Sequence, residues 1–557
     1  MNANPSAAFA RELVASLYDL GVRDFVLCPG SRSGPLAHAL AEAGGGNPPL
    51  GAPRVDLHVR VDERSAAFVA LGIARGRAAT DVPRPVAMIT TSGTAVGNLL
   101  PAVMEAHHSG VPLLLITADR PGEMRGVGAN QTTDQGGIFA TFARWSAEVP
   151  APESLETPGR AATLAARAVA IAMGDPARDD MTGTPGPVHL NIEFREPLEA
   201  DGGVWQDPPR IDPTPSYGTR VLTAADLPAP LPAVERGLVI AGDRAGDVAR
   251  EVAEAHGWPL LAEPTSGARA GDACIGFYVS VLESDAGRSL AEQVHQVVVI
   301  GRPTLSRPIQ QLIARAPSLI VAAHGARWRE APRHADQVVR TVPSSWLTRS
   351  DGTLELGDSA WLAKWREAAS EFEDLAHVWG GDAVADAFMA PLGKGDVAVI
   401  GSSGPIRAVD RVGPVCSPGE VPTLIANRGL SGIDGTVSTA VGVALATGQP
   451  THALMGDVTF LHDVGGLLIG PLEKRPRLRI VVANDGGGTI FGRLEHASAP
   501  AEHVERVFTT PHGVDIGAIC AGYGIPHVAV RNADALARAV AAPPVTLEVV
   551  EARLPRA

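Results

Sequence analysis

Two apolar segments of this 557-residue chain end in polar residues that suit a metal ion. The first, Thr451–Met455, is followed by Asp457, and the second, Leu478–Ala483, is followed by Asn484 and Gly486. The stretch between them is long enough for a crossover between parallel strands, so both ends are expected at the same edge of one sheet. Carboxylate, amide and carbonyl oxygens bind Mg²⁺, which also binds phosphates. The pair therefore predicts a site for a diphosphate and its cation, whereas either end alone is typical of a turn.

This pairing resembles the metal motif of the thiamin-diphosphate enzymes. The resemblance implies that thiamin diphosphate is bound through Mg²⁺ or Mn²⁺, with the Asp457 and Asn484 side chains and the Gly486 carbonyl as ligands. Two features differ from many relatives. Ala483 stands where a second asparagine is common, and the turn has an extra residue near Thr489.

Three further residues bear on cofactor binding. Asp485 lies between two of the implied ligands and is the alternative ligand if the turn is shifted by one residue. By resemblance, Ser403 also contacts the cofactor. Ile433 resembles the bulky apolar residue that holds the two cofactor rings in a bent shape; on its own it would equally suit the core.

Glu63 is the candidate catalytic residue. It follows a short alternating strand and opens an alanine-rich helix, where an acidic residue also complements the helix dipole. In the thiamin family such a glutamate hydrogen-bonds the aminopyrimidine ring and favours the tautomer that activates the reactive carbon. The family places this glutamate and the metal motif in different subunits. A homodimer is therefore the expected minimum, and a homotetramer is the alternative.

The composition excludes several classes of protein. With 45% hydrophobic and 19% charged residues, the chain is ordinary globular material for two to four domains. Its net charge of −14 argues against nucleic acid or an anionic membrane surface as a partner. The N-terminus lacks a basic-apolar signal, and no apolar run is long enough to span a membrane. Four widely spaced cysteines favour reduced thiols and a cytoplasmic location.

The hydrophobic pattern predicts an α/β protein built of three doubly wound parallel-sheet domains, as in the thiamin-diphosphate enzymes. The expected strands lie at 24–28, 85–90, 113–117, 187–192, 237–241, 297–300, 318–322, 397–401, 423–426, 451–455, 478–483 and 544–550. The predicted divisions are a pyrimidine-binding domain (1–200), a Pro-rich linker (201–235), a central α/β domain (236–350), a helical connector (351–380) and a diphosphate- and metal-binding domain (381–557).

Seven motifs narrow the resemblance to one branch of the family. They are Cys28–Ser33, Asp62–Arg64, Thr91–Ala95, Thr117–Pro121, Gly128–Gln131, Gly301–Pro308 and Asn427–Thr436. In this order they resemble the synthases of menaquinone biosynthesis, which transfer an aldehyde or ketone group. The resemblance implies that 2-oxoglutarate is decarboxylated and that the resulting succinyl-semialdehyde carbanion adds to isochorismate.

These substrates carry several carboxylates, so an acidic chain must concentrate positive charge at its site. Arginine suits this task because its planar fork donates two parallel hydrogen bonds to a carboxylate. By resemblance, the substrate-binding residues are Ser31, Arg32, Arg120, Gln131, Arg307, Arg407, Arg428 and Phe491. The aromatic ring would line the apolar part of the substrate pocket.

Two other functions remain open. Another thiamin-diphosphate enzyme, such as an acetolactate synthase or a 2-oxoacid decarboxylase, would share Glu63 and Asp457 but not the arginines. A non-enzymatic relative that binds a metabolite and regulates a partner is the second. The altered turn around Ala483 and Thr489 favours it, whereas the intact Glu63, Asp457 and Asn484 argue against it.

Overall fold

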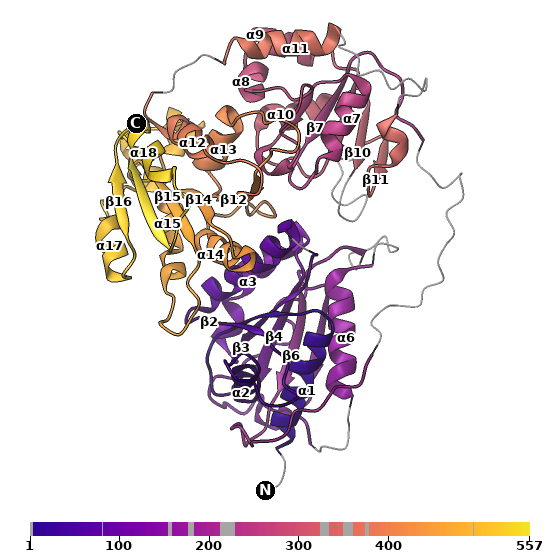
Figure 1. Cartoon of the computed structure of the whole chain (residues 1–557), viewed down its shortest axis with the longest axis vertical. Helices are drawn as coiled ribbons and strands as arrows, with labels where there is room; N and C mark the ends of the chain where they lie inside the picture. Colours follow the sequence, from indigo (N-terminus) through magenta and orange to yellow (C-terminus); the bar gives the residue numbers. More distant parts are fainter. Residues whose placement is uncertain are drawn as a thin grey trace. The chain divides into compact units, whose positions relative to one another are not determined.

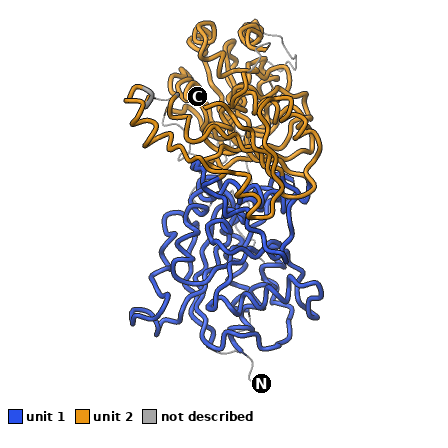
Figure 2. The backbone as a smooth tube through the Cα atoms, turned by 90° about the vertical axis from the view of Figure 1, so that its left-hand side faces the viewer, with its two compact units in different colours: residues 1–217, 429–449, 461–478 blue, residues 218–428, 450–460, 479–557 orange. Residues whose placement is uncertain are grey.

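Three parallel β-sheets form the framework of the chain (Figure 1). The computed structural model describes residues 4–80, 82–153, 159–175, 183–211, 229–322, 334–348, 360–373, 378–493 and 495–556. The chain divides into two compact units, coloured separately in Figure 2. The first unit comprises residues 1–217, 429–449 and 461–478, and the second comprises 218–428, 450–460 and 479–557.

The first sheet has six strands in the order β2-β1-β3-β4-β6-β5, all parallel. Its strands are β1 (Asp24–Leu27), β2 (Asp56–Val59), β3 (Val86–Thr90), β4 (Leu113–Asp119), β5 (Trp145–Val149) and β6 (Val188–Glu193). Its helices are α1 (Pro5–Asp19), α2 (Gly34–Ala43), α3 (Glu63–Thr80), α4 (Thr94–Gly97), α5 (Leu100–Ser109) and α6 (Arg160–Met173).

Alternate strand residues build the core of this sheet. Phe25, Leu27 and Ile89 share one buried cluster with apolar residues of α1, α2 and α6, because successive side chains of a strand point to opposite faces. At the start of α1, the Asn4 side chain accepts hydrogen bonds from the Ser6 and Ala7 backbone N–H groups, which would otherwise lack partners.

The second sheet has five parallel strands in the order β11-β10-β9-β7-β8. They are β7 (Gly237–Ala241), β8 (Leu260–Ala262), β9 (Gln296–Ile300), β10 (Leu319–Ala322) and β11 (Gln337–Val339). Its helices are α7 (Val248–His256), α8 (Tyr278–Glu283), α9 (Asp285–Ala291), α10 (Arg307–Arg315) and α11 (Ala360–Ser370). Both faces are covered, since Leu238 and Val239 of one strand lie in different buried clusters.

The third sheet has six strands in the order β13-β12-β14-β15-β17-β16. They are β12 (Val397–Ile400), β13 (Thr423–Ile425), β14 (Thr451–Gly456), β15 (Leu478–Asn484), β16 (His527–Val530) and β17 (Glu548–Arg553). The helices from residue 381 onward are α12 (Gly381–Met389), α13 (Gly404–Val412), α14 (Thr436–Thr447), α15 (Asp457–His462), α16 (Ala501–Val504), α17 (Ile516–Gly522) and α18 (Ala533–Val540), of which α14 belongs to the first unit. Short 3₁₀ segments lie at Gly122–Met124, Pro264–Ser266, Ser344–Leu347, Val464–Leu467, Thr489–Arg493 and Glu495–Ser498, and a π-helical turn at Glu505–Thr509.

The predicted fold class is confirmed, and each expected strand exists. The last one begins later than expected, at Glu548 rather than at residue 544. Four strands were not predicted as elements of their sheets: β5, β8, β11 and β16. They lie at or beside sheet edges and are three to five residues long, so they lack the continuous apolar run of a central strand. Within the described part of the chain, no helix has the length and apolarity to cross a bilayer.

Helices α3 and α14 pack closely within the first unit because glycines remove side chains from their contact. A Cβ atom on Gly72 would lie 2.2 Å from the carbonyl oxygen of Thr439, and one on Gly442 would lie 2.2 Å from that of Val69. Real Cβ atoms do not approach backbone atoms so closely. The two helices must therefore separate if either glycine gains a side chain.

We expect Gly72→Ala to destabilise the first unit by about 1–3 kcal/mol, because overpacking forces backbone shifts. Thermal unfolding followed by circular dichroism measures this loss as a lower melting temperature. Gly381→Ala is the matched control, since its Cβ would meet no atom within 4 Å at the start of helix α12. Equal melting temperatures for the two variants would contradict the close packing of α3 on α14.

Candidate active site

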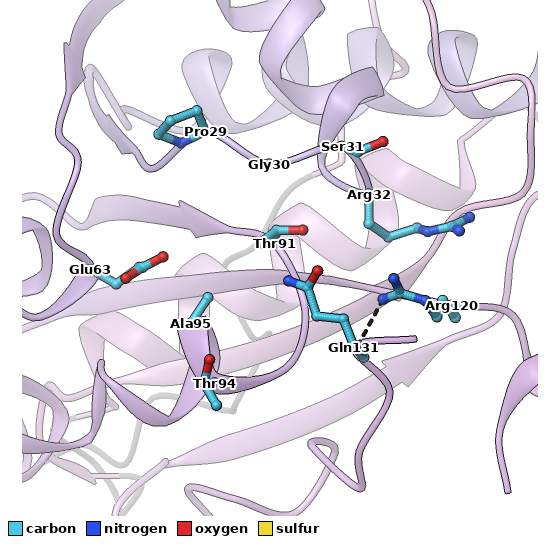
Figure 3. A pocket seen from close by; sticks show the side chains of 10 residues that line it. All are labelled: Pro29, Gly30, Ser31, Arg32, Glu63, Thr91, Thr94, Ala95, Arg120 and Gln131. Carbon is cyan, nitrogen blue, oxygen red and sulfur yellow. Dashed lines mark hydrogen bonds between the residues drawn. The ribbon is translucent and has the colours of Figure 1, made fainter. Parts of the chain in front are cut away.

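A cavity of about 380 Å³ lies in the first unit, at the carboxyl ends of the first four strands. Its lining residues, drawn in Figure 3, are Pro29, Gly30, Ser31, Arg32, Glu63, Thr91, Thr94, Ala95, Arg120 and Gln131. They follow strands β1, β2, β3 and β4, whose carboxyl ends meet at one edge because the strands are parallel. The cavity thus brings together five residues singled out in the sequence: Ser31, Arg32, Glu63, Arg120 and Gln131.

Two glycines allow the cavity loops to approach one another. A Cβ atom on Gly30 would lie 2.3 Å from the Cβ of Thr91, so the loop after β1 can reach the loop after β3 only without a side chain. Gly93 has a φ of +80°, which glycine adopts readily, and a Cβ there would lie 2.8 Å from Cγ of Gln131.

Glu63 occupies one side of the cavity, and Arg32 and Arg120 occupy the other (Figure 3). It is the first residue of α3 and is half-buried, with Asn98 Nδ2 3.5 Å from its Oε2. Burial, and then the charges of Glu63 and Asp62, raise the pKa of the Cys28 thiol far above its usual range. Cys28 is therefore a neutral thiol and does not serve as a nucleophile.

Arg32 and Arg120 are each only 8% exposed. One nitrogen of each is held by the protein: Arg32 Nη1 donates to the Phe194 carbonyl at 2.9 Å, and Arg120 Nη1 donates to the Gln131 carbonyl at 2.8 Å and to the Ser92 hydroxyl. Burial, and then the charge of Arg120, lower the pKa of Arg32. Two buried cations so close together favour an anionic ligand.

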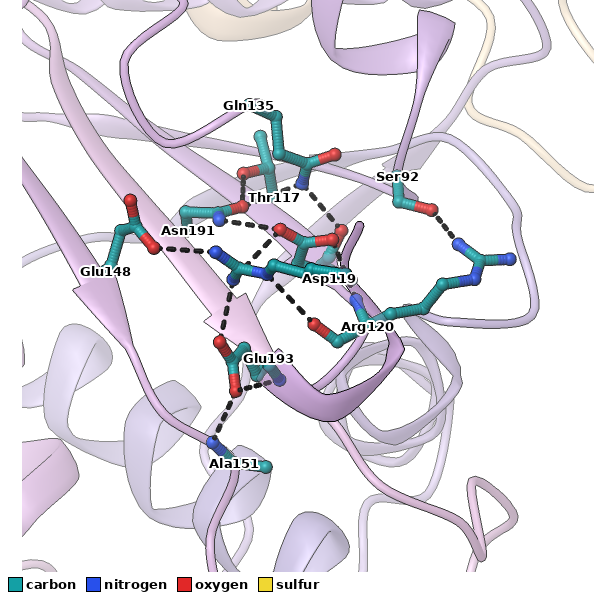
Figure 4. Close-up of polar contacts among 12 residues, drawn as sticks. Ser92, Thr117, Asp119, Arg120, Gln135, Glu148, Ala151, Asn191 and Glu193 are labelled. Carbon is teal, nitrogen blue, oxygen red and sulfur yellow. Dashed lines mark hydrogen bonds and ion pairs between the residues drawn. The ribbon is translucent and has the colours of Figure 1, made fainter. Parts of the chain in front are cut away.

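A buried polar network lies behind Arg120 (Figure 4). Asp119 is fully buried, and its carboxylate accepts hydrogen bonds from the Arg120 backbone N–H at 2.8 Å and from Asn191 Nδ2 at 2.9 Å. It also pairs with Arg125 at 3.1 Å. Gln135 accepts a hydrogen bond from the Gly93 N–H at 3.0 Å and donates to Asn191 at 2.7 Å. This network fixes the two loops that carry Arg120 and Gly93.

In the second unit, the turn after β15 is hydrogen-bonded to Asp457, which directly follows β14. Asp457 Oδ2 accepts hydrogen bonds from the N–H groups of Gly486 at 2.8 Å and Gly487 at 2.9 Å, and lies 3.0 Å from His512 Nε2. Asn484 Oδ1 accepts from the Gly486 N–H at 3.1 Å. The three residues predicted to hold the metal therefore meet at one edge of the third sheet, where the Gly486 N–H donates to both side-chain oxygens.

The donor set of this turn fits a hard divalent cation. A carboxylate, an amide oxygen and a backbone carbonyl are ligands of Mg²⁺ and Mn²⁺, and cofactor phosphates complete such a shell. No group of three or more His, Cys, Asp or Glu side chains in the described residues is arranged to hold a metal, so a site here needs these other oxygens. Asp485 instead accepts a hydrogen bond from the Thr489 hydroxyl, which favours Asn484 as the ligand.

Three predicted arginines of the second unit form a positive cluster. Desolvation, and then the charges of Arg428, Arg411 and Arg307, lower the pKa of Arg407, although its side chain is exposed. Arg407 Nη1 donates to the carbonyl of Ser403, which precedes α13 with a φ of +72°. The cluster therefore lies beside the predicted cofactor contact, and its Arg307 is paired with Glu495 at 2.9 Å.

Buried carboxyl groups hold the loops around this cluster. Arg428 Nη2 donates to Thr304 Oγ1 at 2.8 Å, and Glu263 Oε1 accepts from the N–H groups of Thr304 at 3.0 Å and Leu305 at 2.8 Å. On α13, the Asp410 carboxylate accepts from the Tyr278 hydroxyl at 2.6 Å. Burial, and then the charge of Asp410, raise the pKa of Glu263 to about 8.

Ile433 and Phe491 do not line the cavity of the first unit. Ile433 lies half-buried in the loop before α14, where the buried Glu105 accepts hydrogen bonds from the Gly429 N–H at 2.6 Å and the Leu430 N–H at 2.7 Å. The Phe491 ring, in the second unit, packs on that of Phe508 with centroids 5.4 Å apart.

Sequence reasoning missed four residues that support the site, Glu105, Gln135, Glu263 and Glu551, and gave no role to Asp119 within the motif Thr117–Pro121. One signal was available. Glu105 and Glu551 each have apolar residues on both sides in the sequence, and buried acids need partners. Their partners could not be known, because those lie far away in the sequence.

Comparison with known proteins finds thiamin-diphosphate enzyme domains in the N-terminal and C-terminal parts of the chain. The family described as thiamine pyrophosphate enzyme, N-terminal TPP binding domain, matches residues 8–138, and the corresponding C-terminal TPP binding domain matches residues 414–545. A 2-succinyl-5-enolpyruvyl-6-hydroxy-3-cyclohexene-1-carboxylate synthase from Kineococcus radiotolerans is 45% identical, over 98% of this chain and 96% of its own. One from an Arthrobacter species is 44% identical, over 98% and 89%.

A solved structure shares the fold. The benzoylformate decarboxylase from Polynucleobacter necessarius superposes with a TM-score of 0.66 and covers 98% of this chain and 99% of its own. At 18% sequence identity, this similarity concerns the fold alone.

The raised pKa of Glu263 predicts a pH-dependent stability. Because its folded-state pKa of about 8 exceeds the usual 4.5, the stability it contributes is complete below about pH 4.5 and is lost as the pH rises through 8. In Glu263→Gln the amide oxygen still accepts the two N–H groups but carries no charge. We expect the melting temperature of this variant, relative to the unsubstituted protein, to increase from about pH 6 to 9. A difference that does not change with pH would contradict the shifted pKa.

Proposed function

Because the chain belongs to the family of the 2-succinyl-5-enolpyruvyl-6-hydroxy-3-cyclohexene-1-carboxylate synthases, we propose that it decarboxylates 2-oxoglutarate and joins the remaining four-carbon unit to isochorismate. The products are the cyclohexene carboxylate of the family name and CO₂, in menaquinone biosynthesis. The observation that carries the proposal is the cavity in which Glu63 lies opposite two buried arginines.

Thiamin diphosphate, when bound, supplies the electron sink for the loss of CO₂. The part of Glu63 is to hydrogen-bond the aminopyrimidine ring through its carboxylate and to stabilise the proton that the ring carries. Its place at the start of α3, half-buried and beside Asn98, keeps the carboxylate at the cavity wall. Asp457, Asn484 and the Gly486 carbonyl would hold Mg²⁺ or Mn²⁺ against the diphosphate, and Ser403 and Ile433 would contact the cofactor.

The arginines are proposed to bind the substrate carboxylates. Arg32 and Arg120 have one nitrogen each fixed to the protein, so their planes are held in place for a carboxylate, while Ser31 and Gln131 add neutral donors. The proposed contacts of the second unit are Arg307, Arg407, Arg428 and the apolar ring of Phe491. Mutual repulsion within each arginine group falls when an anion binds, which favours dicarboxylate substrates over neutral ones.

The proposal extends to a homodimer or homotetramer in the cytoplasm, with sites completed between subunits. The first unit exposes apolar side chains close to Glu63. Val61 is 69% exposed and Leu472 is 96% exposed, and the hydrogen bond from the Val59 N–H to Glu473 Oε2 at 2.8 Å brings the two segments together. Contact with a second copy would bury these two side chains.

The direct test is to mix the protein, thiamin diphosphate and Mg²⁺ with 2-oxoglutarate and isochorismate and to identify the product by mass. The expected product has the mass of both substrates minus CO₂. Turnover of pyruvate alone, with no product from isochorismate, would overturn the substrate assignment.

Replacement of Glu63 by Gln tests the catalytic role. The amide cannot stabilise the protonated ring as a carboxylate does, so we expect exchange of the reactive thiazolium proton to slow by at least about a hundredfold. Cofactor affinity should change little, and NMR after an acid quench measures the exchange. Glu123→Gln, at an exposed glutamate paired with Arg195, is the control and should exchange normally. Unchanged exchange in Glu63→Gln would remove Glu63 from this role.

Replacement of Arg120 tests substrate binding. A charge-assisted bidentate contact contributes about 1.5–3 kcal/mol, so Arg120→Ala should raise the KM of one anionic substrate about ten- to over a hundredfold. Arg120→Lys should recover only part of this loss, because an ammonium group cannot reproduce the fork. Thiamin diphosphate affinity, measured by calorimetry, should stay the same. KM values unchanged in both variants would contradict the role of Arg120.

A further inference from the structure

The amide of Asn484 can serve a cation in only one of its two orientations. Its oxygen and nitrogen are similar in size, but the oxygen has lone pairs for a cation and the nitrogen carries hydrogens. A rotation of the amide by half a turn would point the NH₂ group at the metal. A neighbouring hydrogen-bonding group must therefore bind one end of the amide selectively. Whether that group donates or accepts determines which end of the amide faces the cation.

Glu551 supplies this distinction from the adjacent strand. It pairs with Val482 in the register of β17 on β15, so its side chain lies on the same face as those of Val482 and Asn484. Its Oε1 lies 2.7 Å from Asn484 Nδ2, and the residue is 2% exposed. An ionised carboxylate only accepts hydrogen bonds, so it can face the NH₂ end of the amide and not the oxygen.

The other oxygen of Glu551 has charged partners. Arg553 Nη2 and His527 Nε2 each lie 3.1 Å from Oε2, so the carboxylate is paired with a guanidinium group while Oε1 is directed at the amide. A buried acid with this pairing remains an acceptor. The orientation of the Asn484 amide is thus set by a carboxylate of the neighbouring strand.

The opposite end of the amide faces the predicted ligands. Asn484 Oδ1 accepts from the Gly486 N–H, and Asp457 Oδ2 accepts from the same N–H. The two oxygens therefore lie on the same side of the turn. Because the Nδ2 end is engaged by Glu551, the amide presents only oxygen to this side.

We infer that Glu551 is a positioning residue that orients the Asn484 amide so that its oxygen faces the divalent cation. The inference rests on the proposed function, in which Asp457, Asn484 and Gly486 hold Mg²⁺ or Mn²⁺. It assigns no ligand role to Glu551 itself, whose carboxylate is already satisfied by Asn484, His527 and Arg553.

The test measures Mn²⁺ affinity of the full-length protein with thiamin diphosphate, by electron paramagnetic resonance of the free ion. We expect Glu551→Ala to weaken Mn²⁺ binding about tenfold or more, the usual effect of losing a group that orients a metal ligand. Glu551→Gln should also weaken binding, because the glutamine oxygen would face the Arg553 guanidinium and its NH₂ group would then face the Asn484 amide.

Glu548→Ala is the matched control. Glu548 lies on the same strand and loses an equivalent arginine partner, Arg479 at 2.7 Å, but does not contact Asn484. Its Mn²⁺ affinity should equal that of the unsubstituted protein. Equal affinities for Glu551→Ala and Glu548→Ala would overturn the inference, as would a Glu551→Gln variant that binds Mn²⁺ as tightly as the unsubstituted protein.

A double variant separates orientation from general damage to the strand. If Glu551 acts through Asn484, the double variant with Asn484→Ala and Glu551→Ala should bind Mn²⁺ no more weakly than Asn484→Ala alone. Additive losses would overturn the inference. Asp457→Ala separates a failure of the proposed metal site from a failure of the orienting role of Glu551. If it binds Mn²⁺ normally, the proposed metal site fails; if it loses Mn²⁺ while Glu551→Ala does not, only the orienting role fails.

Discussion

Parallel pairing of the strands is the constraint on which the sites of this protein depend. In a parallel sheet every strand must run in the same direction, so the loops that leave the strands gather at one edge. In the first unit this places Glu63, Arg32 and Arg120 around one cavity, although they leave three different strands. In the second unit it places Asp457 and the turn of Gly486 together, because β14 and β15 are neighbours.

Buried carboxylates fix the conformation of the loops that meet at these sheet edges. Asp119, Glu105 and Glu551 are each at most 4% exposed, and each accepts hydrogen bonds from N–H groups of a segment that carries site residues. A carboxylate only accepts, so it selects which atoms of its partner face it. Apolar packing holds an element in place but does not distinguish an amide oxygen from an amide nitrogen. These acids therefore determine orientation, whereas the sheets determine position.

The sequence was sufficient for the sheets and for most strand ends. The apolar runs of β1, β7 and β14 are continuous because both faces are covered, and this made their positions readable. The short strands β5 and β16 were not readable, since each exposes part of its surface. For the site, the family motifs predicted Glu63 and Asp457, but Glu263 and Glu551 depend on partners from distant segments. Hydrogen bonds of that kind have no periodic signal in a sequence.

Two groups of arginines concentrate positive charge in an acidic chain of net charge −14. Arg32 and Arg120 in one unit, and Arg407 and Arg428 in the other, lie near like charges that lower the pKa of Arg32 and of Arg407 after desolvation. The acids that support these segments bind backbone N–H groups, as Asp119 does for Arg120 and Glu263 does for Thr304. A substrate carboxylate bound between two such arginines would relieve the repulsion between them.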